Sequence, residues 1–236
     1  KTYSEKMKTI LIPTDFSKGA ENALVYAIAL AKKENAKIIL LNAYHITYFV
    51  TEFTGKTDTQ IVDEMEVSVN KNLQSLCQII SKKKKVKCEY ISKYALAVDG
   101  ILDAIRKKKP DMVIMGTKGA SGVKEIFIGS NTARVIEKAR CPVIAVPQGA
   151  SFKGIRQITF AMDYHESDIH AMKKLVEIAK PFNAKITVLH ASNEELLRDA
   201  EEIGMERFKN LVSRKIKYNK ISFQVVYGKH LEKVLQ

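Results

Sequence analysis

The sequence has no tryptophan, only three cysteines, and no apolar run long enough to cross a membrane. A membrane-spanning helix needs about 20 consecutive apolar residues. The N-terminal stretch KTYSEKMKTILIP also lacks the apolar run and the small-residue cleavage site of a secretory signal peptide. These absences exclude a membrane protein as a class and predict a cytoplasmic location.

The cysteines are too few and too scattered for a disulfide framework or a zinc module. They are Cys77, Cys88 and Cys141, and they form no CxxC pair. An odd number without that spacing favours reduced thiols used in packing. The histidines His165, His170 and His190 offer no third converging ligand. We therefore predict no metal site and assign no catalytic residue.

Positive charge is abundant: the chain has 39 Lys and Arg but only 26 Asp and Glu, which gives a formal net charge of +13. The lysines and arginines cluster at 32–33, 81–87 and 106–109, and each cluster closes a stretch with helical periodicity. Cations complement the partial negative charge of a helix C-terminus. No interleaved aromatic residues accompany them. The pattern favours solvated helix ends over a nucleic-acid surface, so nucleic acid is an unlikely partner.

Short apolar runs alternate with helical patterns along the first 147 residues. Expected strands lie at 9–13, 36–44, 86–92, 111–115 and 141–147, and expected helices at 17–34, 61–81, 97–108 and from 130 onward. Ser17 stands where it can cap the first helix. Such alternation predicts an α/β fold with a doubly wound, mostly parallel sheet covered on both faces.

The pattern then restarts after a segment of linker composition. Residues 15–43 align without a gap to 163–191, an offset of 148, and ten of these 29 positions are identical. This self-similarity predicts tandem copies of one domain. We expect a first domain at 7–147, a linker at 148–155 and a second domain at 156–236. By this alignment the second copy lacks its C-terminal part, about 45 residues covering its glycine loop and last strands.

The segment MGTKGASGVKEIFIGSNTARVI (115–136) places glycines in the spacing Gly116-x2-Gly119-x9-Gly129-Ser130 between a strand and a helix. Glycine lets backbone N–H groups approach an anion closely, and a helix N-terminus adds unpaired donors. In an open parallel sheet, ligands bind beyond the carboxyl ends of the strands. The segment therefore predicts an anion site, against the alternative of a surface loop with turn glycines and a serine cap. It is neither a Walker A loop nor a Rossmann fingerprint.

These motifs resemble the universal stress protein family. The likeness rests on ILIPTDFS, AKIILLNAY, the stretch DMVIMGTKGASGVKEIFIGSNTARVIEKARCPVIAVP and the repeat ITFAMDY…NAKITVLHA. It implies a tandem member with a Rossmann-like fold of the adenine nucleotide alpha hydrolase type. Members of the family that keep the G-x2-G-x9-G-[S/T] spacing bind ATP, and the first copy keeps it.

The resemblance also implies a binding site for ATP, with Mg²⁺. The turn after the first strand and the end of the second would line the nucleoside, the end of the fourth strand would lie beneath the ribose and phosphates, and the loop would cradle the phosphates. The implied residues are Pro13, Thr14, Asp15, Ala43, Met115, Gly116, Gly119, Gly129, Ser130, Asn131 and Thr132. For Asp15 the alternative is a carboxylate that complements the dipole of its own helix.

Three functions stay open at this point. The favoured one is a nucleotide-binding sensor or regulator of the stress response. The alternatives are a slow ATPase or self-phosphorylating enzyme that uses Ser130 or Thr132 as acceptor, and a nucleotide-free dimeric scaffold. The apolar run PVIAVP (142–147) should form a sheet edge. In the family this strand pairs across a dimer, which implies a homo-oligomer or an intramolecular pseudo-dimer.

Overall fold

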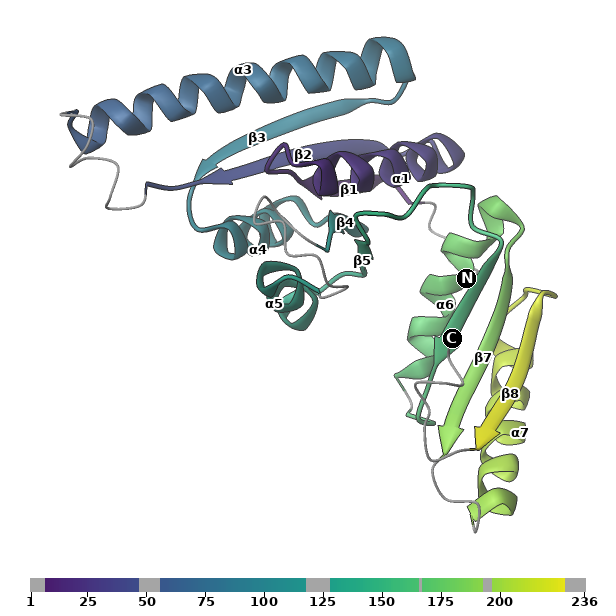
Figure 1. The fold of residues 1–236 in the computed structure, drawn as a ribbon. Helices are drawn as coiled ribbons and strands as arrows, with labels where there is room; N and C mark the ends of the chain where they lie inside the picture. Colours follow the sequence, from purple (N-terminus) through teal and green to yellow (C-terminus); the bar gives the residue numbers. More distant parts are fainter. Residues whose placement is uncertain (1–6, 47–55, 118–127, 166, 193–196, 228–236) are drawn as a thin grey trace. The chain divides into compact units, whose positions relative to one another are not determined.

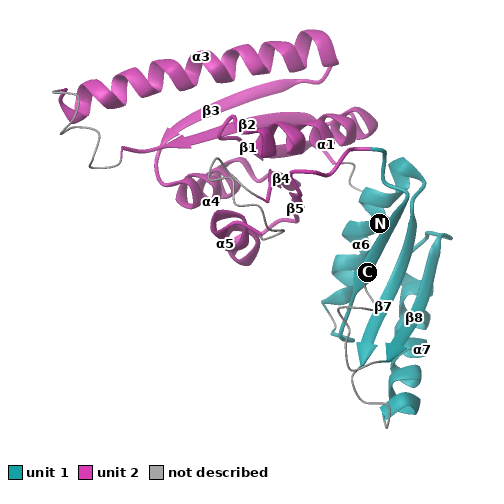
Figure 2. Cartoon of the chain, viewed as in Figure 1, with its two compact units in different colours: residues 1–4, 153–236 teal, residues 5–152 magenta. Residues whose placement is uncertain are grey.

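A computed structural model describes residues 7–46, 56–117, 128–165, 167–192 and 197–227. The chain divides into two compact units: residues 5–152 form one, and the residues from 153 onward belong to the other (Figure 2). None of the helices in these ranges combines the length and apolar composition that a membrane crossing requires.

The first unit is built on a five-stranded sheet in the order β3-β2-β1-β4-β5, with all four pairings parallel (Figure 1). The strands are β1 (Thr9–Pro13), β2 (Lys37–Tyr44), β3 (Cys88–Tyr94), β4 (Met112–Gly116) and β5 (Val143–Val146). The direction of strand order reverses between β1 and β4. The connection after β1 leads to β2 on one side, and the connection after β4 leads to β5 on the other side. As predicted, β5 lies at an edge.

Helices cover both faces of this sheet. They are α1 (Lys18–Glu34), α3 (Asp58–Lys84), α4 (Ala97–Lys108) and α5 (Ser130–Lys138). On one face Leu11, Ile39 and Val113 pack with residues of α4 and α5 in one core cluster. Side chains alternate along a strand, so Ile12 and Leu40 face the opposite side, towards α1 and α3. Both sets are almost fully buried, which explains why the strands read as continuous apolar runs.

Capping residues determine where α1 and α3 begin. The Ser17 side chain accepts a hydrogen bond from the Ala20 N–H and caps α1. Helix α3 is longer than its expected range of 61–81, because Thr57 and Gln60 form a reciprocal capping box ahead of the apolar repeat. Strand β3 is displaced by two residues from its expected start, since Val86 and Lys87 still belong to the turn after α3.

The second unit repeats the first half of this fold. Its parallel sheet has the order β6-β7-β8. Its elements are β6 (Gln157–Ala161), α6 (Asp168–Ala179), the 3-10 turn Lys180–Phe182, β7 (Lys185–Ser192), α7 (Arg198–Lys215) and β8 (Ile221–Tyr227). Gln157 pairs with Lys185 as Thr9 pairs with Lys37, so the register repeats at the offset of 148. The α/β fold class is confirmed: a five-stranded parallel domain precedes a three-stranded sheet consistent with an incomplete second copy. The sequence pattern of the second copy also predicts the beginning of a helix at 229, which lies outside the described residues.

Strand β4 approaches α1 more closely than a side chain would permit. A Cβ built on Gly116 would lie 2.8 Å from the carbonyl oxygen and 2.9 Å from the carbonyl carbon of Gly19, in the first turn of α1. Real Cβ atoms do not come this close to backbone, and backbone cannot rotate away. Gly116 is therefore needed for packing, whatever else it contributes.

Gly116→Ala should lower the free energy of unfolding by about 1–3 kcal/mol, the usual cost of overpacking a tight contact. Urea denaturation followed by circular dichroism measures it. Gly149→Ala is the matched control, because a Cβ there has nothing within 4 Å. A Gly116→Ala protein as stable as the Gly149→Ala protein would contradict the packing role.

Candidate functional site

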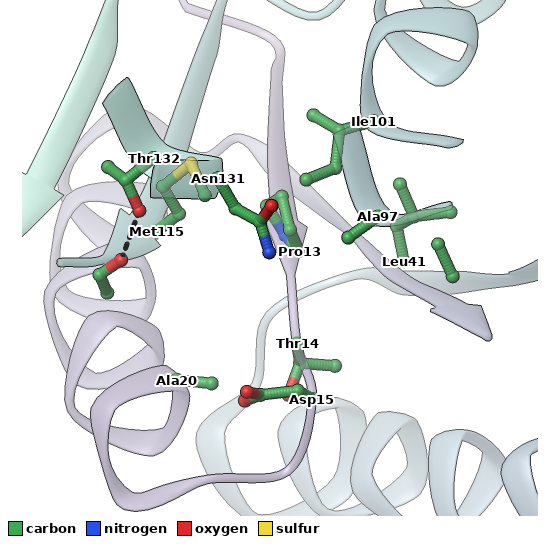
Figure 3. A pocket seen from close by; sticks show the side chains of 12 residues that line it. Pro13, Thr14, Asp15, Ala20, Leu41, Ala97, Ile101, Met115, Asn131 and Thr132 are labelled. Carbon is green, nitrogen blue, oxygen red and sulfur yellow. Dashed lines mark hydrogen bonds between the residues drawn. The ribbon is translucent and has the colours of Figure 1, made fainter. Parts of the chain in front are cut away.

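A pocket opens at the carboxyl edge of the first sheet, where β1, β2 and β4 end and α4 and α5 begin (Figure 3). Twelve residues line it: Pro13, Thr14, Asp15, Ala20, Leu41, Ala43, Ala97, Ile101, Met115, Gly116, Asn131 and Thr132. Residues more than 100 positions apart in the sequence thus meet because parallel strands end at one edge.

Most of the residues implied by the sequence lie in this pocket. Eight of the eleven line it: Pro13, Thr14, Asp15, Ala43, Met115, Gly116, Asn131 and Thr132. Gly129 and Ser130 stand directly before Asn131, at the start of α5, but are not lining residues. Gly119 lies outside the described residues.

Sequence reasoning missed four lining residues: Ala20, Leu41, Ala97 and Ile101. Two of them were recoverable from periodicity. Leu41 precedes Ala43 by two positions on β2 and so shares its face, and Ile101 follows Ala97 by one turn of α4. Nothing in the sequence, however, indicates that α4 packs beside these strand ends.

Three helices, α1, α4 and α5, begin at the pocket, and their N-termini differ in how their backbone donors are satisfied. At α4, the N-cap residue Leu96 provides no side-chain cap, and Asp99 lies in the first turn. At α1, the Ser17 hydroxyl accepts from the Ala20 N–H, and the Asp15 carboxylate accepts from the Ser17 N–H at 3.0 Å. At α5, the N-cap residue is Gly129, which has no side chain to cap with, and the first turn carries no acidic residue. The N-cap residue of α5 therefore offers no side-chain acceptor to the first N–H groups of the helix.

Gly129 adopts φ −58° and ψ 151°. Any residue adopts these angles, so the backbone conformation does not require a glycine here. Its N–H donates to the Thr117 carbonyl at 2.6 Å, which links the N-cap of α5 to the residue that follows β4. The remaining reason for a glycine here is that its missing side chain leaves space beside the helix N-terminus.

The Thr132 hydroxyl is already engaged. It donates to the Gly116 carbonyl at 2.9 Å, and Thr132 is only 3% exposed. The hydrogen bond holds the first turn of α5 against the end of β4 (Figure 3). The resemblance implies Thr132 as a residue of the phosphate cradle, and in the structure its hydroxyl proton is donated to the Gly116 carbonyl.

The pocket has an apolar side and a polar side. Leu41, Ala97 and Ile101 form the apolar side, whereas Asp15 and Asn131 contribute polar groups (Figure 3). Asn131 extends from α5 beside Pro13. No lysine or arginine lines the pocket within the described residues. A flat apolar ring with an anionic tail fits such a division, with the ring against the apolar wall and the anion at the start of α5.

The corresponding edge of the second sheet is arranged differently. His190 occupies the position of Asn42: its Nδ1 lies 2.8 Å from the Met162 carbonyl oxygen, as the Asn42 amide donates to the Thr14 carbonyl. The second ring nitrogen of His190 lies 2.9 Å from a Glu201 carboxylate oxygen. In the described ranges, no group of three His, Cys, Asp or Glu residues could hold a metal ion.

Comparison with known proteins places this geometry in a family. A model of the universal stress protein family matches residues 6–147. Universal stress protein MJ0531 of Methanocaldococcus jannaschii is 28% identical over 139 residues, which are 59% of this chain and 81% of that protein. A universal stress protein of Thermus aquaticus is 28% identical over 150 residues, covering 59% of this chain and 98% of the relative.

Two solved structures extend the comparison. The hypothetical protein MJ0577 superposes with a TM-score of 0.50 and 28% identity, over 62% of this chain and 99% of its own. A universal stress protein of Archaeoglobus fulgidus reaches a TM-score of 0.74 over 96% of this chain and 81% of its own. At 20% identity, that second likeness concerns the fold alone.

Proposed function

The chain belongs to the universal stress protein family, and from that premise we propose that its first domain binds ATP, with Mg²⁺, and acts as a nucleotide-dependent sensor. The site is the pocket at the carboxyl edge of the five-stranded sheet. The domain bounds that we adopt are 7–147 for the binding domain and 156–236 for the second copy, joined by a linker.

The observation that carries this proposal is the uncapped N-terminus of α5. Of the helices that begin at the pocket, α1 is capped by the Ser17 side chain, whereas α4 and α5 have no side-chain cap at their N-cap residues. Helix α4 carries Asp99 in its first turn, which repels an anion, and the first turn of α5 carries no acidic residue. Unpaired N–H groups and the positive end of a helix dipole attract phosphate. The phosphates of the nucleotide therefore belong at Ser130–Thr132.

The apolar wall suits the nucleobase. Ala43 is small, and a Cβ on Gly100 of α4 would come within 2.7 Å of its side chain, so β2 and α4 pack closely here. Leu41 and Ile101 extend the wall beside it. A planar base buries apolar area against such a surface, while Asp15 at the rim can accept from a ribose hydroxyl or the adenine amine.

Binding without rapid turnover is the activity that the pocket favours. Asp15 is the one titratable side chain among its described lining residues, and an oxygen of its carboxylate already accepts from the Ser17 N–H. Catalysis of phosphoryl transfer needs a group that orients or deprotonates the nucleophile near the γ-phosphate. The buried and bonded Thr132 hydroxyl is a poor phosphate acceptor, which leaves Ser130 for a self-phosphorylating enzyme.

Gly129→Val should abolish detectable ATP binding while the protein stays folded. A β-branched side chain at the N-cap of α5 would obstruct the approach of phosphate to the helix N-terminus. Isothermal titration with Mg-ATP measures the affinity, circular dichroism checks the fold, and Gly149→Val serves as a control in open space. Unchanged affinity in a folded Gly129→Val protein would overturn the site.

Two further measurements separate the sensor from its rivals. Denatured wild-type protein should release adenine nucleotide that mass spectrometry detects, and denatured Gly129→Val protein should release none. Nucleotide-free wild-type protein with no ATP affinity would instead support the scaffold.

Steady-state phosphate release should stay at background. Turnover that Gly129→Val abolishes would favour the ATPase, and phosphate on Ser130 would favour the self-phosphorylating enzyme.

The exposed edge of the sheet supports association with a second copy or a second domain. Strand β5 pairs only with β4 in the described sheet. The Pro142 and Val146 carbonyls accept from β4 and its extension, so the alternate residues Val143 and Ala145 direct their backbone groups outward. An apolar edge left unpaired promotes aggregation.

Ala145→Pro should shift the protein towards monomer, because it removes an outward-directed N–H without touching a bond to β4. Multi-angle light scattering after gel filtration measures the mass. Gln148→Pro, just beyond the strand, is the control. A wild-type protein that is monomeric across the concentration range and has the same mass as Ala145→Pro would rule out pairing between chains through β5.

A further inference from the structure

The edge opposite the proposed nucleotide site gathers lysines from two separate clusters. Helices α1 and α3 both end at the amino edge of the sheet (Figure 1). A hollow of about 330 Å³ lies between their ends. Nine residues line it: Ala31, Lys32, Asn35, Ala36, Lys83, Lys84, Lys85, Val86 and Lys87. The clusters at 32–33 and 81–87, which the sequence presents as two helix ends, thus form one surface, here called the lysine hollow.

Helix capping accounts for only part of this charge. Each helix C-terminus carries roughly half a negative charge, so two of them offset about one ammonium group. Five lysines line the hollow. The lining contains no carboxylate, and among the described residues none of these five lysines forms an ion pair. Lys37 nearby does, at 3.0 Å from Glu89. Among the described residues, the lining therefore carries more positive charge than the two helix ends offset.

Lys85 occupies a backbone position that costs energy. It is the C-cap of α3 with φ 60° and ψ 36°, in the left-handed region. Glycine or asparagine takes this position more readily, and the chain uses asparagine for it at Asn35 and Asn183. A lysine here thus places a charge in the hollow at the expense of local stability. Lys109 caps α4 in the same conformation but lies outside the hollow.

We propose that the lysine hollow binds a polyphosphate chain, that is, a flexible anion with closely spaced phosphate groups. The volume lies at the lower end of the range for small-ligand sites, about 300–1,000 Å³. Lysines are mobile point charges that neutralise phosphates without demanding a fixed geometry. Several of them around one concavity match a ligand that presents several charges within a short length.

The composition of the hollow argues against other anions. It contains no aromatic side chain on which a base could stack and no arginine for bidentate contact with a base edge. The lysines surround a hollow, whereas a lipid bilayer presents its headgroups on a broad, nearly flat surface. Nucleic acid and anionic membranes are therefore the comparison ligands in the test.

The decisive comparison uses two double variants of the full chain that change equivalent helix positions. Lys84→Gln with Lys85→Gln alters the last residue and the C-cap of α3, and Lys108→Gln with Lys109→Gln alters the same two positions of α4. Each double variant removes two positive charges. All four lysines are exposed, and Lys85 and Lys109 share the left-handed backbone conformation. Only the first pair removes lysines from the hollow.

Long-chain inorganic polyphosphate should bind the wild type and the Lys108/Lys109 variant equally, and the Lys84/Lys85 variant about tenfold more weakly or worse, because two phosphate contacts and their counterion release are lost. Fluorescence titration at several salt concentrations measures both affinity and its salt dependence. The slope of log affinity against log salt should fall by about 1–2 in the Lys84/Lys85 variant alone. Saturating Mg-ATP should leave polyphosphate affinity unchanged.

Single glycine variants separate binding from stability. Lys85→Gly and Lys109→Gly should both raise the urea midpoint, because glycine relieves the left-handed C-cap, yet only Lys85→Gly should weaken polyphosphate binding. Equal loss in the two double variants would reduce the effect to net charge and overturn the proposal. Displacement by Mg-ATP, or tighter binding to duplex DNA or to phosphatidylserine vesicles at matched phosphate concentration, would also overturn it.

Discussion

The first domain depends on the close contact at Gly116, where one strand end holds the starts of two helices. Its Cα packs against the Gly19 backbone of α1, and its carbonyl accepts from the Thr132 hydroxyl of α5. The next carbonyl, of Thr117, accepts from the Gly129 N–H. These contacts fix where both helix N-termini point. In the function that we propose, backbone donors bind the phosphates, so the contacts that fix the helices also form the site.

The sequence predicts well what is local and periodic. Ser17 as a cap, Ser130 as the start of a helix and the parallel order of strands all follow from spacing and turn residues. It predicts poorly what depends on two distant segments meeting. Thr132 reads as a free hydroxyl because its acceptor, the Gly116 carbonyl, is 16 positions away. The lysine clusters read as separate caps because only the packing of α1 beside α3 brings them together.

The two copies show which features belong to the fold and which to the site. Left-handed backbone recurs at Phe16 and Tyr164, and again at Asn35 and Asn183, each pair separated by the offset of 148. Phe16 and Tyr164 lie in the turn from the first strand to the first helix of each copy, and Asn35 and Asn183 lie in the turn from that helical segment to the second strand. Asn42 and its counterpart His190 keep the same hydrogen bond with different chemistry. The duplicated geometry therefore belongs to the architecture, and a function assigned to the first copy does not transfer to the second through it.

The distribution of charge gives the two ends of the first domain different kinds of selectivity. The pocket at the carboxyl edge has no lysine or arginine among its described lining residues, so the binding that we propose there relies on the directed N–H groups of a helix N-terminus. In the lysine hollow, five ammonium groups on flexible stems attract an anion with closely spaced charges, and this attraction weakens as the salt concentration rises. A net charge of +13 draws anions to the whole surface. Shape and donor geometry must then decide which anion enters the pocket at the carboxyl edge.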